Sequence, residues 1–89
     1  MITSIILIKV KRNKVNEVAD KLVDIPEISE VYSVAGKYDL VAIVRVKEND
    51  DLASLVTNKL SVFGDIKKTD TMLAFKAYSR HDLDSMFSL

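Results

Sequence analysis

Apolar residues gather in six segments of this chain, and their spacing within each segment predicts a strand or a helix. Four segments are rich in Ile and Val and are bounded by charged or turn-forming residues, which is typical of strands: 2–10, 28–36, 39–47 and 66–78. Two further segments, one after the first strand and one after the third, repeat apolar residues at helical spacing. The predicted order of elements is therefore β-α-β-β-α-β.

The two predicted helices have recognisable ends. The first covers residues 14–24 and has Asn13 as its N-cap, while the second begins at a cap of Asn49 or Asp50 and ends at Gly64. Each helix has one apolar face, formed by Val15, Val18, Ala19, Leu22 and Val23 in the first helix and by Leu52, Leu55, Val56 and Leu60 in the second.

A short polar break between the second and third strands predicts a hairpin, because Gly36 can take the positive φ that a tight turn needs. Together the elements fit an α+β, ferredoxin-like sandwich, in which an antiparallel sheet has two helices on one face. The chain of 89 residues has no linker or repeat, so we expect a single domain over 1–89, with residues 79–89 as a short C-terminal tail.

Both faces of the predicted sheet are apolar, which two helices on one face do not explain. In the first strand Ile6, Ile8 and Val10 alternate with Ile5 and Leu7, whereas a strand with one wet face would alternate apolar with polar residues. The plainer alternative is that strand residues are apolar by composition alone. We expect a second copy of the chain to cover the free face, because soluble monomers rarely expose so large an apolar patch.

The composition of the chain argues against several classes of function. Lys and Arg number 13, as do Asp and Glu, so the chain lacks the basic excess of nucleic-acid binders. It has no cysteine for disulfides or thiolate metal sites, and its single histidine does not make a zinc site. The apolar N-terminal run is too short to cross a bilayer and precedes its basic residues, the reverse of a signal peptide. We expect a cytoplasmic protein without a cofactor, membrane contact or direct nucleic-acid contact.

The stretch VAGKYDLV, residues 34–41, interrupts the apolar pattern with groups that suit a small zwitterion. A loop with Gly36 exposes backbone N–H and C=O groups, and Asp39 adds a fixed negative charge. Thr69 and Thr71 add two hydroxyls on one face of the last strand, since they lie two residues apart. A free carboxylate needs such donors and a free ammonium such acceptors. Turn chemistry explains the loop equally well, with Asp39 bonding local backbone.

Two other clusters are weaker candidates. The basic residues within 9–14 have no interleaved aromatic residue, so they fit a solvated strand end better than a phosphate site. His81 lies between polar and acidic neighbours in the tail, with no nucleophile arrangement to support catalysis. Leu83, Met86 and Phe87 have helical spacing, so the tail is predicted to form a short amphipathic helix.

The chain resembles the effector-binding domain, called the RAM domain, of the Lrp/AsnC family of transcription regulators. The resemblance runs from about residue 3 to residue 78 and is carried by the apolar first strand, by IPEISEVYSVAGKYDLVAIVRV and by GDIKKTDTML. The family pattern there has Gly-x-Tyr-Asp before an apolar strand, and later an aliphatic residue with a spaced threonine pair. Each piece is weak alone, whereas the pieces in this order and at this spacing are fairly specific.

This resemblance implies sheet-to-sheet dimers, often assembled into octamers, with a free amino acid bound between dimers. The ligand-binding residues that it carries over to this chain are Gly36, Lys37, Tyr38, Asp39, Thr69 and Thr71. Family regulators also have an N-terminal helix-turn-helix, for which this chain has no room, so we expect a stand-alone version without direct DNA binding. It either acts alone or joins mixed oligomers with a full-length regulator of the family.

Three functions stay open from the sequence. The leading hypothesis is a non-enzymatic amino-acid-sensing and oligomerisation module linked to transcription regulation. The second is a small enzyme of the dimeric α+β barrel type, which needs a polar cavity between helix and sheet. The apolar inward residues Val18, Leu22, Leu55 and Val56 argue against it. The third is a purely structural oligomerisation domain in which the loop is only a turn.

Overall fold

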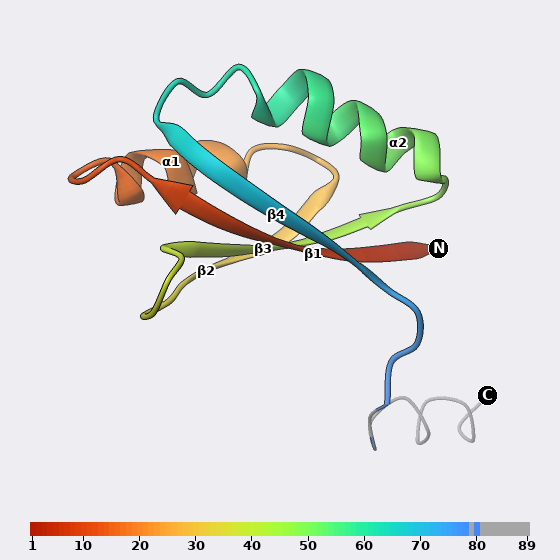
Figure 1. The fold of residues 1–89 in the computed structure, drawn as a ribbon. Helices are drawn as coiled ribbons and strands as arrows, with labels where there is room; N and C mark the ends of the chain where they lie inside the picture. The colour runs from red at the N-terminus through yellow and green to blue at the C-terminus, as the bar shows by residue number, and fades with distance from the viewer. Residues whose placement is uncertain (79, 81–89) are drawn as a thin grey trace.

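The computed structural model describes residues 1–78 and 80, and its elements follow the predicted order (Figure 1). The strands are β1 (Ile2–Val10), β2 (Ile28–Ser33), β3 (Leu40–Val46) and β4 (Ile66–Ala74). The helices are α1 (Val15–Leu22) and α2 (Asn49–Ser54), and α2 leads directly into the π-helix η1 (Leu55–Leu60). The predicted tail helix and His81 lie outside the described residues.

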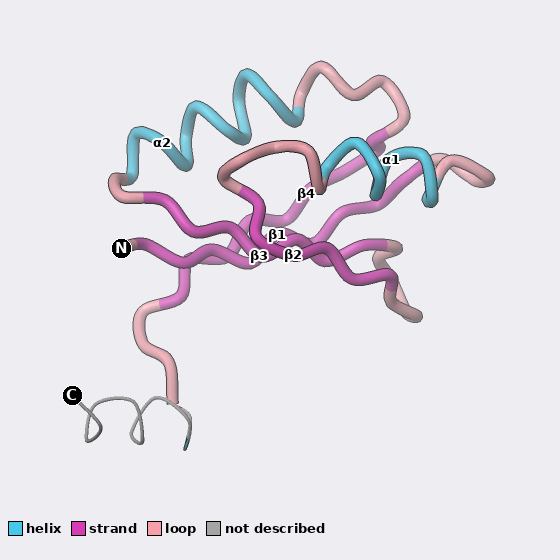
Figure 2. The backbone as a smooth tube through the Cα atoms, turned by 180° about the vertical axis from the view of Figure 1, so that it is seen from behind, coloured by secondary structure: helices cyan, strands magenta, loops and turns pink. Residues whose placement is uncertain are grey.

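The four strands form one antiparallel sheet in the order β2-β3-β1-β4. Strands β1 and β3 are therefore central, while β2 and β4 are edges. Both helices lie on the same side of this sheet (Figure 2). The predicted α+β, ferredoxin-like arrangement is thus confirmed. In the part of the chain that the structure describes, no helix is long and apolar enough to span a membrane.

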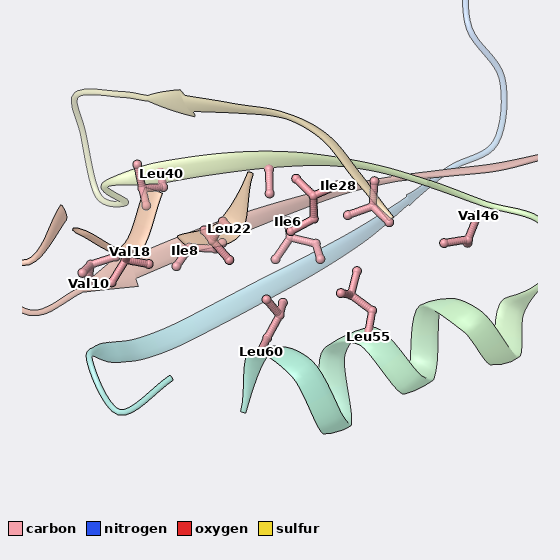
Figure 3. Packing of buried hydrophobic residues seen from close by; sticks show 12 residues of the cluster. Ile6, Ile8, Val10, Val18, Leu22, Ile28, Leu40, Val46, Leu55 and Leu60 are labelled. Carbon is pink, nitrogen blue, oxygen red and sulfur yellow. The ribbon is translucent and has the colours of Figure 1, made fainter. Parts of the chain in front are cut away.

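The hydrophobic core fills the space between the helices and the central strands (Figure 3). Alternate residues of β1 and β3 point into it, and each Ile, Leu or Val side chain among them contributes about 1.5–3 kcal/mol by leaving water. Of the inward helix residues named from the sequence, Val56 is half-buried and the other three are buried. The buried apolar residues are Ile6, Ile8, Val10, Val18, Leu22, Ile28, Leu40, Ala42, Val44, Val46, Leu55 and Leu60.

A β-bulge in each edge strand decides which residues face the core. The pairing of β2 with β3 shifts between Ile28 and Glu30, so Ser29 is an extra residue. Ile28 therefore enters the core, while Glu30, two residues later, faces away from it. A second shift makes Lys67 the extra residue of β4 and sets the face of every residue that follows it.

Two helix N-caps predicted from the sequence are wrong. Asn13 is not the N-cap of α1: it has a φ of +68° in the preceding turn, a conformation that asparagine tolerates, and Lys14 takes the cap position. At α2 the N-cap is Glu48 instead of either predicted residue. The Asp51 side chain accepts a hydrogen bond from the backbone N–H of Glu48 at 3.2 Å, which satisfies a donor at the helix start.

Candidate functional site

The loop between β2 and β3 turns at Gly36, whose φ of +124° is a conformation that residues with a side chain rarely adopt. The N–H of Val34 donates to the carbonyl of Asp39 at 3.0 Å and closes the turn. Gly36 and Lys37 are exposed, whereas Tyr38 and Asp39 are partly buried. The turn predicted from the sequence is therefore present, and its tip is open to solvent.

The Asp39 side chain ends the hydrogen-bond ladder between β1 and β3. The backbone N–H of Asp39 donates to the carbonyl of Ile8 at 2.9 Å, and the side-chain Oδ2 of Asp39 accepts the N–H of Val10 at 2.8 Å. A backbone carbonyl would accept that second N–H in a continued ladder, so the carboxylate replaces it where the chain turns away. The Lys9 ammonium lies 3.7 Å from the same oxygen. An acidic residue at this point therefore has a structural reason.

Thr69 and Thr71 share the helix-side face of β4, since they pair with Ile8 and Ile6, whose side chains lie under the helices. This confirms that the two hydroxyl residues lie on one face. Thr69 is partly buried, whereas Thr71 is exposed although its partner Ile6 is 0% exposed. The helix layer thus covers β1 and stops short of Thr71 at the edge of the sheet.

The loop and the threonine pair lie at the same end of the sheet without meeting in one chain. Leu40, the first residue of β3, and Thr69 both pair with Ile8, so β1 stands between them. Two strand spacings make this separation about 10 Å. The Asp39 carboxylate contacts Lys9, which alternates with buried neighbours and so leaves β1 on the face away from the helices. The side chains of Asp39 and Thr69 therefore point to opposite faces of the sheet, and the six predicted residues form two separate groups.

Beside Thr69 lies a groove of about 200 Å³ between the end of η1 and the start of β4, which we call the β4 groove. The sequence did not indicate it, because it depends on where η1 ends and where the bulge in β4 turns the chain. Its apolar lining residues lie near the core, and its polar lining residues come from the turn after η1 and from β4. The lining consists of Val56, Leu60, Ser61, Phe63, Ile66, Lys67, Lys68 and Thr69.

A larger groove of about 360 Å³ lies at the far end of β3, between the turn before β2 and α2. Among the charged side chains that line it, Lys59 and Glu27 form an ion pair. The Lys59 ammonium lies 2.7 Å from Oε1 of Glu27, and the Arg45 guanidinium donates to the Ser29 hydroxyl at 2.9 Å. Among the described residues, no group of three potential metal ligands lies together in this groove or elsewhere.

The face of the sheet away from the helices, called here the open face, has an apolar centre. Ile5 pairs with Ile43 on one side and with Met72 on the other, and Leu7 pairs with Val41. Met72 is 43% exposed, and the other four side chains are partly exposed. Within the described residues, neither helix covers these side chains.

Polar groups border this apolar centre at both edges. At the β2 edge the Tyr32 hydroxyl donates to Glu30, and the Arg45 guanidinium lies 4.0 Å from the same carboxylate. The hydrogen bond to Glu30 and its negative charge raise the pKa of Tyr32 above its ordinary value. At the β4 edge, Asp70 lies beside Leu7. An apolar centre within a polar rim is the usual anatomy of a protein–protein interface.

Curated relatives of this chain include HTH-type transcriptional regulators. The family model described as the Lrp/AsnC ligand binding domain matches residues 3–83. HTH-type transcriptional regulator FL11 of Pyrococcus furiosus is 43% identical over 77 residues, which make up 86% of this chain and 50% of the relative. The chain spans about half the length of the curated relatives that it matches.

Solved structures agree with this match. The protein TTHA0845 from Thermus thermophilus has a TM-score of 0.84 and 41% identity, over 90% of this chain and 100% of that one. E. coli AsnC has a TM-score of 0.82 at 23% identity, over 88% of this chain and 53% of that one, which supports the fold alone. The predicted resemblance is confirmed, and so is the prediction of a non-enzymatic domain, since the relatives are regulators and the matching domain binds ligands.

Proposed function

Because this chain belongs to the Lrp/AsnC ligand-binding domain family, we propose that it is an effector-sensing and oligomerisation module linked to transcription regulation. Its effector is a free amino acid. Its assembly starts from a dimer closed through the open face and extends to larger rings such as octamers. It works in the cytoplasm, either alone or in mixed oligomers with a full-length regulator of the family.

The open face supports the dimer. Its apolar centre runs across β1, β3 and the neighbouring residues of β4, so a second sheet laid against it would remove the partly exposed Ile5, Leu7 and Ile43 from water. The polar groups at both edges remain at the rim of such a contact, where solvent still reaches them. If the helices cover one face of the sheet and a second copy covers the other, both faces of the central strands are buried. This explains why both faces are apolar.

The observation that carries the effector proposal is the separation of the predicted ligand groups within one chain. The side chains of Asp39 and Thr69 point to opposite faces of the sheet, and β1 lies between them. A small amino acid has its carboxylate and ammonium on one carbon, so it cannot reach both groups of a single copy. Residues from a neighbouring copy can complete the site. Effector binding would then be coupled to assembly, because a ligand bound only at an interface stabilises that interface.

Asp39 can serve the ligand and the fold at once. An ionised carboxylate offers about four lone-pair positions. The N–H of Val10 takes one of them, and Lys9 is a longer-range partner. The remaining positions can accept hydrogen bonds from an ammonium group, while exposed backbone groups at Gly36 contact the rest of the ligand.

Calorimetry with each protein amino acid, combined with light scattering, tests this function. At least one amino acid is expected to bind below millimolar concentration and to shift the mass of the assembly. If the protein forms a dimer but no amino acid binds, the effector proposal fails and a purely structural oligomerisation domain is the better description. A protein that stays monomeric overturns the assembly as well.

A further inference from the structure

We propose that the β4 groove selects an amino acid with a compact apolar side chain, whose carboxylate lies against Lys67 and Thr69. This inference rests on the proposed function, since Thr69 belongs both to the predicted ligand residues and to the groove. It goes further by naming the side-chain class of the effector and the orientation in which it binds.

The size and lining of the β4 groove favour a ligand with an apolar side chain. At about 200 Å³ it is smaller than the roughly 300–1,000 Å³ of pockets for drug-sized ligands, so only a small molecule fits. Leu60 is 2% exposed, and Val56, Phe63 and Ile66 are partly buried, so apolar area is available inside. None of the lining residues is acidic, and a cationic side chain would therefore lose water there without gaining an opposite charge.

Lys67 and the edge of the strand favour this orientation of the ligand. Lys67 has no carboxylate within ion-pair distance among residues 1–78 and 80, whereas Lys59 in the larger groove is paired with Glu27. Lys67 is also the extra residue of the bulge, and β4 is an edge strand, so backbone N–H groups are available beside it. Charged and backbone donors next to the Thr69 hydroxyl suit one carboxylate. A second carboxylate, on an acidic side chain, would have to lie against apolar residues.

Titration calorimetry on the full chain tests the inference with leucine and methionine against lysine, glutamate and glycine. Leucine or methionine is expected to bind at least about tenfold tighter than the other three. Leucinamide, which lacks the carboxylate, is expected to bind about 10- to 150-fold more weakly than leucine, the range for losing a hydrogen bond to a charged group.

Two matched variants locate the site. Ser61→Trp fills the β4 groove and is expected to abolish leucine binding, while Ser54→Trp fills the larger groove and is expected to leave it unchanged. The two serines are comparable, because both are exposed and each has one hydrogen bond along the helix, Ser61 to the carbonyl of Thr57 and Ser54 from the Asn58 amide at 3.2 Å. Circular dichroism checks that both variants fold.

A second pair keeps the test decisive if the tryptophan variants do not fold. Lys67→Gln is expected to weaken leucine binding about tenfold or more, whereas Lys47→Gln, at an exposed lysine lining the larger groove, is expected to have no effect. Tighter binding of lysine or glutamate than leucine, or wild-type binding by both Ser61→Trp and Lys67→Gln, overturns this inference and leaves the effector proposal standing. Absence of binding by every amino acid overturns the proposed function, and the inference with it.

Discussion

Asp39 combines a structural and a proposed ligand-binding role, and two substitutions separate them. Asp39→Ala removes the acceptor for the N–H of Val10, a residue that is only 3% exposed, and should lower the free energy of unfolding by about 1–3 kcal/mol. Asp39→Asn keeps an oxygen acceptor and loses the charge, so it should retain most of this stability. It should nevertheless weaken amino-acid binding by about 1.5–3 kcal/mol. Urea unfolding and calorimetry measure the two effects.

Lys37→Ala is the control for stability, because its side chain is exposed in the same loop and belongs to no ion pair among the described residues. Its unfolding free energy should match that of the wild type. If Asp39→Asn unfolds as readily as Asp39→Ala, the hydrogen bond to Val10 does not explain the acidic residue.

Gly36 is the residue whose backbone most restricts substitution in the loop. Gly36→Val places a β-branched side chain at a φ of +124° and should cost about 1–3 kcal/mol of stability, although the site itself has open space around it. The matched control is Gly64→Val, where the space is also open and no unusual φ is imposed. Equal losses in the two variants, measured by urea unfolding, would contradict the role assigned to the backbone at Gly36.

At the scale of single residues, the sequence identified the loop and the threonine pair because their residue types interrupt apolar segments. It did not indicate that Asp39 accepts the N–H of Val10, which lies 29 positions earlier. That contact depends on the register between β1 and β3, and register is a property of the folded sheet. The ligand roles of the loop and threonine residues remain predictions.

At the scale of elements, the pattern of apolar residues predicted the order of the strands and helices in the described residues, but β2 and β4 end earlier than predicted, at Ser33 and Ala74. Local irregularities also change which residues are buried. Leu55 and Leu60 are five positions apart, which would separate them by about 140° around an α-helix. Both are buried, and the segment that contains them is the π-helix η1, whose wider turn brings such residues closer to one face. The bulges at Ser29 and Lys67 similarly change the alternation of β2 and β4, and a simple period does not reveal them.

The open face gives a prediction about the sheet as an element. Ile43→Lys places a charge at the centre of this face, between Ile5 and Glu30. It should split or unfold the proposed dimer at a cost of several kcal/mol, roughly that of an unpaired buried charge. Val62→Lys is the matched control, because Val62 is 71% exposed just after η1. Size-exclusion chromatography with light scattering reports the mass of both. A wild-type mass for Ile43→Lys would show that the interface lies elsewhere.

At the scale of the whole molecule, charge predicts how the chain behaves toward DNA. With 13 basic and 13 acidic residues, it lacks the excess positive charge that attracts phosphates. The 89-residue chain alone should leave a target duplex unprotected in a footprinting assay at moderate salt. A footprint from this chain alone would contradict the prediction. A footprint that changes only when a full-length family regulator is also present would support mixed oligomers.

The proposed dimer through the open face and the proposed ligand site between copies both require the chain to associate. The mass of the wild-type protein therefore tests both proposals. Sedimentation equilibrium at micromolar concentration should give at least a dimer without ligand, and a larger assembly once an amino acid that binds is added. Asp39→Asn should give the same dimer and a weaker shift with the same amino acid. A mass of one chain, both without ligand and with every amino acid tested, would contradict a site shared between copies.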